Sequence, residues 1–276
     1  MITLIIGRES NLSQSIFKLL ENSVLISSRE LSEDIKLLDK YKDKHINIIF
    51  NNFQSAPYLN DLSKIDIYIH QSIQITSSVL QYVKEFSINK IIYNSSSSLY
   101  GNNPFCSEID TVYPSNLHSS LKLSNELLIE TYCKQYNIDY TITRIFNMYG
   151  GNDKFSIISK IIESYKNNTT LNIINNGNGI RDFIHVYDVS LSIIKLLNST
   201  NINLINIGTG KGISIMDILD NLKRYNIYIE TKNIDLNDTI DVSISNNTKL
   251  LSIIDKTFID LNEYILKKCK ESLCVE

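Results

Sequence analysis

The feature that most constrains this chain is a series of short apolar runs that alternate with segments of helical pattern. The runs cover residues 2–6, 24–26, 46–50, 90–94 and 138–145. Runs this short and this uniformly apolar are typical of parallel strands buried on both faces. The first intervening segment carries Ile16, Leu19 and Leu20 at helical spacing. This alternation predicts an α/β fold built on a doubly wound parallel sheet.

Length and charge indicate an ordinary globular protein. The chain has 276 residues, of which 43% are hydrophobic, and a net charge of −3. This length is enough for one large α/β domain with a small appendage. The charge balance favours neither a nucleic-acid partner nor an anionic membrane surface. The longest apolar runs are too short to span a bilayer.

Two further features predict a cytoplasmic protein. Met1 leads directly into an apolar run, without the basic segment or the cleavage site of a secretory signal. The four cysteines are scattered and form no CxxC pair. Such spacing argues against a disulfide framework and against a metal site, and it fits a reducing compartment.

Polar residues follow several of the predicted strands. Gly7, Arg29, Asn51 and Ser96 all fall at or just beyond strand ends. Ligands of doubly wound sheets bind beyond the carboxyl ends of the strands. The convergence of these four residues predicts a binding cleft there.

The stretch from residue 89 to 126 carries the chemistry. A buried strand at 90–94 passes into a run of serines, and a predicted helix begins near His118. Residues four apart lie on one helix face, so His118 and Lys122 point the same way. A strand that ends in hydroxyls beside a titratable group and a lysine indicates proton handling.

This stretch resembles the extended short-chain dehydrogenase/reductase family, in the branch that acts on nucleotide-linked sugars. That family carries Ser-Ser-x-x-x-Tyr-Gly at the strand end and Tyr-x-x-x-Lys on the helix. The chain keeps the serines, Tyr100-Gly101, Lys122 and Glu126, but His118 stands in place of the tyrosine. The resemblance implies a catalytic group of Ser96, His118 and Lys122.

Two later segments extend the resemblance to about residue 250. Residues 144–150 match the family's Arg-x-x-Asn-x-Tyr-Gly, and residues 177–189 match its Gly-x-x-x-Arg-Asp-Phe-Ile-His-Val-x-Asp-Val nearly residue for residue. The implied architecture is a Rossmann-type doubly wound sheet with a small mixed α/β C-terminal substrate-binding subdomain. The implied division is 1–150 for the dinucleotide, with contributions from about 180–212, and 151–276 mainly for the substrate.

The resemblance also implies dinucleotide contacts. Family members read Gly-x-x-Gly-x-x-Gly after the first strand, whereas this chain keeps Gly7 and has Ser10 and Ser13 at the next two positions. These serines either donate to phosphate at the helix N-terminus or merely cap the helix. The full set of cofactor contacts implied is Gly7, Ser10, Leu12, Ser13, Ser27, Ser28, Arg29, Asn51, Asn52, Phe53 and Lys122.

The end of the second strand favours NADP over NAD. An acidic residue there selects NAD, and an arginine accommodates the 2′-phosphate of NADP. Residues 27–29 contain no acid, and Arg29 is preceded by two hydroxyls. The alternative is a solvated loop arginine, in which case NAD is the cofactor.

The implied substrate is a nucleotide-diphosphate sugar, held by Ser96, Ser97, Ser98, Tyr100, Asn147 and Arg181. A guanidinium suits a pyrophosphate because it is planar, charged and multidentate. The alternative for Arg181 is an ion pair with Asp182 or Asp188 that only orders the loop. Tyr100 is expected to form a wall of the pocket.

The serines also bear on the type of reaction. Sugar 4,6-dehydratases of the family place Thr-Asp-Glu where Ser96, Ser97 and Ser98 stand, and hydroxyls cannot readily replace that acid and base. An NADP-dependent reductase of a nucleotide-linked 4-keto sugar, serving surface-polysaccharide synthesis, is the first hypothesis. An NAD-dependent 4-epimerase and a catalytically silent dinucleotide-binding homologue are the alternatives.

His118 leaves the activity open. Histidine can act as an acid or base, but imidazole is shorter than phenol and would not reach where the tyrosine oxygen lies. The chain is therefore a laboratory substitution, a natural enzyme that uses His118, or a homologue that binds without catalysis. The resemblance also implies a homodimer through a four-helix bundle, formed by apolar faces near 73–82 and 118–133.

Overall fold

The computed structural model describes residues 1–52, 62–237, 240–255 and 257–271. Phe53 lies outside the described residues. Six parallel strands form the main sheet, in the order β2-β1-β3-β4-β5-β9. They are β1 (Ile2–Ile6), β2 (Ser23–Ile26), β3 (His45–Phe50), β4 (Ser87–Ser96), β5 (Asp139–Ile145) and β9 (Leu204–Ile207). The predicted doubly wound parallel sheet is confirmed.

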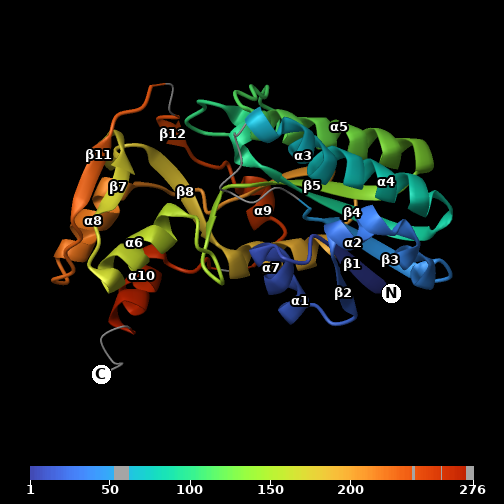
Figure 1. The fold of residues 1–276 in the computed structure, drawn as a ribbon, viewed down its shortest axis with the longest axis horizontal. Helices are drawn as coiled ribbons and strands as arrows, with labels where there is room; N and C mark the ends of the chain where they lie inside the picture. The colour runs from blue at the N-terminus through green and yellow to red at the C-terminus, as the bar shows by residue number, and fades with distance from the viewer. Residues whose placement is uncertain (53–61, 238–239, 256, 272–276) are drawn as a thin grey trace.

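Helices cover both faces of this sheet (Figure 1). One layer holds α3 (Ile65–Ile69), α4 (Ile75–Tyr82) and α5 (Leu117–Tyr136), and the other holds α1 (Asn11–Leu19) and α7 (Val186–Leu197). Because side chains alternate along a strand, Leu4 and Ile6 pack into the core below α4 and α5, whereas Ile5 packs below α1 and α7. Both faces of these strands are buried, which explains why the runs are apolar at every position.

The strand order reverses between β1 and β3. β1 pairs with β2 on one side and with β3 on the other. In such sheets, ligands bind at the carboxyl ends of the strands where the order reverses. Gly7 follows β1 at this point with φ of +107°, and a Cβ added there would lie 2.4 Å from the carbonyl oxygen of Asn51. Only glycine lets the two strand ends approach so closely.

A smaller lobe holds most of the chain after β5 (Figure 1). Its strands are β6 (Asn147–Tyr149), β7 (Leu171–Ile174), β8 (Ile180–His185), β10 (Gly212–Ser214), β11 (Thr231–Ile234) and β12 (Val242–Ser243). Its helices are α6 (Ile157–Asn167), α8 (Ile215–Lys223) and α10 (Leu261–Lys270). A separate core that includes Ile161, Phe183 and Ile218 holds this lobe together. The chain returns to the large lobe through α7 and β9.

The remaining elements are short. They are α2 (Ser28–Glu33), η1 (Ile35–Tyr41), η3 (Leu62–Lys64), the π-helix η4 (His70–Gln74), η5 (Val83–Glu85), η6 (Ser97–Tyr100), η7 (Asn175–Gly177) and α9 (Thr248–Leu251). No helix among the described residues is long and apolar enough to cross a membrane.

Candidate active site

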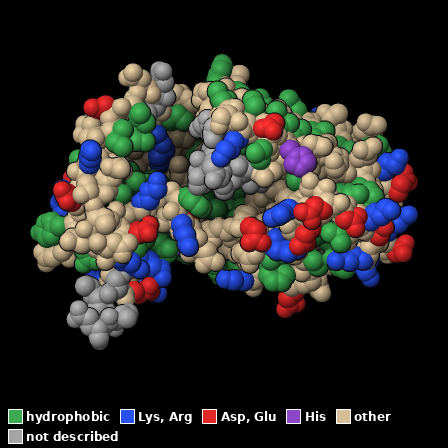
Figure 2. All heavy atoms as spheres, in the orientation of Figure 1, with side chains coloured by type: hydrophobic (Ala, Val, Ile, Leu, Met, Phe, Trp, Pro, Cys, Tyr) green, Lys and Arg blue, Asp and Glu red, His purple; other side chains and the backbone are tan. Residues whose placement is uncertain are grey.

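A cavity of about 870 Å³ opens at the carboxyl ends of β1, β2 and β3. Asn147 and Phe183 of the smaller lobe also line it, and Figure 2 shows the molecule hollowed where the lobes meet. The expected site residues that line it are Gly7, Ser10, Ser27, Ser28, Arg29, Asn51, Asn52 and Asn147. The tertiary structure thus brings together residues from four segments of the chain.

Asn51 organises the phosphate side of this cavity. Its amide nitrogen donates to the hydroxyl oxygens of Ser10, at 2.7 Å, and Ser13, at 2.9 Å. Ser10 makes no side-chain capping bond to α1. Its hydroxyl hydrogen can therefore serve an anionic oxygen at the helix N-terminus, where backbone amides are also available. Leu12 buries its side chain in the core, so only its backbone amide can serve a ligand.

The end of β2 carries a charge pair that the sequence analysis missed. The amides of Gly7 and Arg8 both donate to the carbonyl of Ile26, which brings the loop after β1 against α2. The Arg8 guanidinium then binds the Glu30 carboxylate through two hydrogen bonds, of 2.9 and 2.6 Å. Arg29 is 89% exposed and is 3.4 Å from Glu33. An acidic residue is therefore present near the end of β2.

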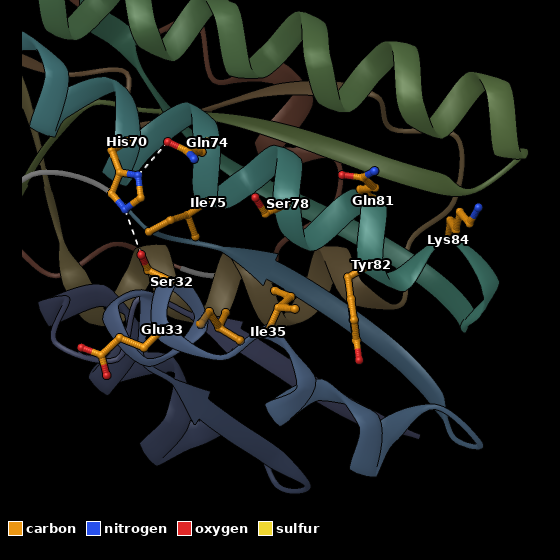
Figure 3. A pocket seen from close by; sticks show the side chains of 11 residues that line it. Ser32, Glu33, Ile35, His70, Gln74, Ile75, Ser78, Gln81, Tyr82 and Lys84 are labelled. Atoms are coloured by element: carbon orange, nitrogen blue, oxygen red, sulfur yellow. Dashed lines mark hydrogen bonds between the residues drawn. The ribbon is translucent and has the colours of Figure 1, made fainter.

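A second hollow, of about 650 Å³, lies between α2 and α4 and meets the first at Ser32, His70 and Ile75. Figure 3 shows His70 between Ser32 and Gln74, and its ring nitrogens are 2.9 and 2.7 Å from their oxygens. The groove extends the cavity past the end of β2. None of these residues was expected at a site, because they follow no recognisable motif.

The catalytic candidates gather where α5 begins beside the end of β4. Asn116 starts the helix through a capping box with Ser119, which fixes the first turn that carries His118. The Lys122 ammonium donates to the carbonyl of Asn94 at 2.6 Å and lies 5.1 Å from the centre of the Tyr93 ring. Lys122 is thereby pinned to β4.

Burial controls the protonation of both side chains. Burial, and then the positive charge of Lys122, lower the pKa of His118 to about 3. Burial lowers the pKa of Lys122 to about 7, although the Glu126 carboxylate acts in the opposite direction. His118 is therefore neutral near pH 7, whereas Lys122 changes charge in that range.

The serine run lies at the end of β4 and in η6. The Ser96 hydroxyl oxygen accepts from the amide of Ser98 at 3.2 Å and caps η6. It still has its hydrogen to donate. The described residues that line the large cavity do not include Ser96, Ser97, Ser98, His118 or Lys122. They form a neighbouring cluster instead.

Two residues that were expected to contact the substrate, Tyr100 and Arg181, have other contacts in the structure. Tyr100 is 1% exposed and packs against Phe146 in a small core, so little of its side chain is accessible to a ligand. The Arg181 guanidinium donates to the backbone carbonyls of Ile240 and Asp241. Burial lowers the pKa of Arg181.

The two carboxylates considered as partners of Arg181 have other roles. The Asp182 carboxylate accepts from the amide and hydroxyl of Thr209, at 2.9 and 2.6 Å. The Asp188 carboxylate accepts from the amide of Ile259 at 2.8 Å. Arg181 thus orders the loop through backbone carbonyls, in place of the ion pair that was considered.

One missed residue had a signal in the sequence. Dinucleotide-binding chains place the ribose-binding acid about 20 residues beyond the glycine-rich turn. Glu30 lies close to that distance from Gly7, one residue beyond the three that were inspected. The pairing of Glu30 with Arg8 had no such signal, because it depends on how the two loops meet.

Solved structures share this fold over nearly the whole chain. The UDP-glucose 4-epimerase of Thermus thermophilus, in complex with NAD, has a TM-score of 0.87 at 14% identity, and the match covers 100% of both chains. The UDP-N-acetylglucosamine 4-epimerase of Methanobrevibacter ruminantium M1 has a TM-score of 0.82 at 22% identity, covering 99% of this chain and 97% of that one. At such identities the likeness shows the fold alone.

Curated relatives are similar over part of the chain. A putative UDP-glucose 4-epimerase of Methanocaldococcus jannaschii is 30% identical over 209 residues, 72% of this chain and 65% of the relative. A UDP-glucuronate 4-epimerase of Thermodesulfobacterium geofontis is 31% identical over 163 residues, 57% of this chain and 50% of the relative. The chain thus spans about half to two thirds of the length of these relatives.

The model of the NAD dependent epimerase/dehydratase family matches residues 15–208, more than two thirds of the chain. This match covers the serine run, the segment with His118 and Lys122, and the 177–189 segment on which the resemblance rested. It therefore confirms the resemblance drawn from those motifs. The chain belongs to the NAD dependent epimerase/dehydratase family.

Proposed function

We propose that this chain binds NAD and a nucleotide-diphosphate sugar and belongs to the 4-epimerase class of its family. The similar proteins named above as 4-epimerases of UDP-linked sugars support this class over the reductase expected first. The chemistry that bound NAD supplies is the reversible removal of a hydride from the sugar. The protein's part is to hold the two ligands and to move one proton on a sugar hydroxyl.

The observation that carries the choice of cofactor is the Arg8–Glu30 pair. Glu30 lies beside the cavity through its pair with Arg8, which lines it, and the Glu30 carboxylate would repel a 2′-phosphate. Arg8, which could attract that phosphate, is already engaged with Glu30. NAD therefore fits this end of the cavity better than NADP.

The rest of the cavity fits a dinucleotide as well. The close approach at Gly7, the two hydroxyls held by Asn51 and the free amides of α1 together suit a pyrophosphate. Ser32 and His70 mark a continuation of the cavity beyond the ribose end. We place the adenosine half of the cofactor on that side.

Lys122 and Ser96 are assigned to the reacting centre. Lys122 would hold the nicotinamide ribose, and the Ser96 hydroxyl would donate to the reacting sugar oxygen. His118 stands where the family has its tyrosine, but an imidazole whose pKa is about 3 is a weak base and carries no proton to give near neutrality. We therefore expect binding of both ligands with slow turnover.

The test is a pair of fluorescence titrations with NADH and NADPH on the full chain. NADH should bind about tenfold more tightly than NADPH, because the Glu30 carboxylate would repel the 2′-phosphate of NADPH. A repulsion between two like charges at one contact typically changes affinity by that amount or more. Incubation with UDP-linked sugars then reports epimer formation by chromatography. Binding of neither dinucleotide would overturn the proposal.

The NADP-dependent reductase is kept as a second candidate because Arg29 lines the cavity and is 89% exposed. If Arg29 holds a 2′-phosphate, NADPH should bind more tightly than NADH, and Arg29→Ala should remove that preference. Glu33→Gln is the matched control, because it frees Arg29 without shortening it. A preference for NADH that Arg29→Ala leaves unchanged would exclude this candidate.

A homodimer is the third part of the proposal. Ile75 and Val79 of α4 are buried in the core, so we place less of the contact on the face expected near 73–82. The exposed apolar side chains of this layer include Ile65, Ile67 and Ile69 of α3 and Leu127 of α5. We propose that a second copy covers them.

A further inference from the structure

A buried ion pair lies behind the catalytic cluster. Glu126 of α5 and Arg144 of β5 are joined by hydrogen bonds of 3.2 and 2.8 Å, and their side chains are 5% and 6% exposed. Removing two charges from water is costly, so a buried pair is weak evidence for stability alone. The pair lies between α5 and the strand ends of β4 and β5, a position that suits it to orient the catalytic cluster.

Glu126 lies on the helix that carries His118 and Lys122 and contacts the strand end that carries Ser96. It lies one turn beyond Lys122, on the same face of α5. Its carboxylate also accepts a short hydrogen bond from the hydroxyl of Ser95, the residue just before Ser96. One carboxylate thus sets the register of the helix that carries His118 and Lys122 against the strand end that carries Ser96.

Arg144 extends this contact to the serine turn. Its guanidinium lies 4.9 Å from the centre of the Tyr100 ring, at the end of η6. The Tyr100 hydroxyl donates to the Asn206 amide oxygen at 2.7 Å, and the amide nitrogen of Asn206 donates to the carbonyl of Cys106 at 2.9 Å. The pair is therefore connected to both ends of the segment that contains Ser97 and Ser98.

We propose that Glu126 and Arg144 are positioning residues that hold Lys122 and Ser96 at their working separation and keep a negative charge near the Lys122 ammonium. This rests on the proposed function, which gives Lys122 and Ser96 their roles. Among the described residues, the charged or titratable groups near Lys122 include His118 and Glu126 on its own helix and Tyr93 on β4. Among these, Glu126 is the anionic one.

The chain contains a matched control for a purely structural pair. Lys90 and Asp139 form a second ion pair between the same strands, β4 and β5, at 2.8 Å and at their opposite ends. The Lys90 side chain is 1% exposed. This pair lies far along the strands from Ser96 and has no contact with α5 in the hydrogen bonds of the described residues.

The experiment compares Glu126→Gln with Asp139→Asn in the full chain. Each variant removes one carboxylate charge and keeps the side-chain volume. Both should lower the unfolding midpoint in urea. Glu126→Gln alone should lower the rate of epimer formation, by about tenfold or more, because small displacements of reacting groups have effects of that size. Dinucleotide affinity should change by less than about threefold in Asp139→Asn.

A second readout does not depend on turnover. The titration of Lys122 can be followed by NMR on protein labelled at the lysine ε-carbons, with Lys122→Arg to assign the signal. Because Glu126 stabilises the charged ammonium, Glu126→Gln should move the midpoint below the starting value, whereas Asp139→Asn should leave it in place. This readout stays informative if the unmodified chain proves inactive.

Ser95→Ala is the milder variant, in case Glu126→Gln does not fold. It removes one contact to the carboxylate and leaves the ion pair intact, so the rate should fall in the same direction by a smaller factor. The proposal is overturned if Glu126→Gln folds and leaves both the rate and the Lys122 midpoint unchanged. It is also overturned if Asp139→Asn alters them equally.

Discussion

His118 lies one helical turn before Lys122, and burial together with that lysine lowers the pKa of its imidazole to about 3. The same ammonium would lower the pKa of a tyrosine at this position, whereas burial would raise it. The neighbouring cation therefore assists a phenol and disables an imidazole. At the scale of single residues, the site is built for an acid that is neutral when protonated.

We predict that His118→Tyr increases the rate of epimer formation, by about a hundredfold. The phenol oxygen restores the reach that the shorter imidazole lacks, and misplacement by about 1 Å can cost that factor. The measurement is turnover of a UDP-linked sugar by both proteins at saturating NAD. A double variant with Lys122→Met serves as the control and should lose the gain. If His118→Tyr were slower than the parent, the site would instead be adapted to histidine.

A second prediction at this scale concerns Lys122 and pH. Burial lowers its pKa to about 7 in the folded protein, against 10.5 ordinarily. Between these values the unfolded chain holds a proton that the folded protein has released. The free energy of unfolding should therefore rise with pH in this window, by at most about 1.4 kcal/mol per pH unit.

Urea unfolding at about pH 7.5 and about pH 9.5 tests this prediction. The unmodified chain should gain stability relative to Lys122→Met as the pH rises. Parallel behaviour of the two proteins would mean that Lys122 keeps its charge through the window.

At the scale of elements, the ends of parallel strands create the site and the helices create its support. Gly7, Ile26 and Asn51 meet because β1 pairs with both β2 and β3. Helices α4 and α5 pack apolar side chains onto the sheet, while α3 and α5 also leave apolar side chains exposed. An exposed apolar surface of this kind is typical of an interface.

We predict that Leu127→Glu shifts the chain from dimer to monomer. Leu127 is 55% exposed on α5, and a carboxylate there would be buried without a partner in a packed bundle. Size-exclusion chromatography with light scattering measures the change. Ile109→Glu is the control, because Ile109 is 94% exposed on a loop outside this layer. A monomeric parent chain would contradict the proposed dimer.

At the scale of the whole molecule, the cavity is lined by residues of both lobes. The large lobe provides most of the residues that line the cavity, and the small lobe contributes Asn147 and Phe183 to its other side. Asp182 of β8 links the small lobe to the segment after β9, because its carboxylate accepts hydrogen bonds from Thr209 and Ser245. Each lobe has its own core, so each ligand should stabilise the protein separately.

We predict that Arg181→Ala reduces the thermal stabilisation produced by a UDP-linked sugar and leaves that produced by NAD nearly intact. A ligand at about a hundredfold its Kd stabilises a protein by about 2.7 kcal/mol, which differential scanning fluorimetry detects. Arg224→Ala, an exposed arginine of the same lobe, is the control. Equal loss of both effects would mean that Arg181 mainly anchors the 240–241 backbone.

The sequence by itself determined the parallel sheet, the place of the cleft and the family. Uniform apolar runs can only be buried on both faces, and parallel strands bring Gly7, Arg29, Asn51 and Ser96 to one edge. These are local patterns with a fixed geometric meaning. Gly7, Arg29 and Asn51, which line the cavity, could therefore be placed there without knowing how the rest of the chain packs.

Only the tertiary structure decided which charges and rings face the ligands. The pairing of Arg8 with Glu30, the burial of Tyr100, and the use of Arg181 to hold residues 240–241 join segments far apart in the chain. The lowered pKa of His118 likewise depends on burial beneath other elements. Long-range packing sets these properties, because desolvation and pairing depend on neighbours that no local pattern specifies.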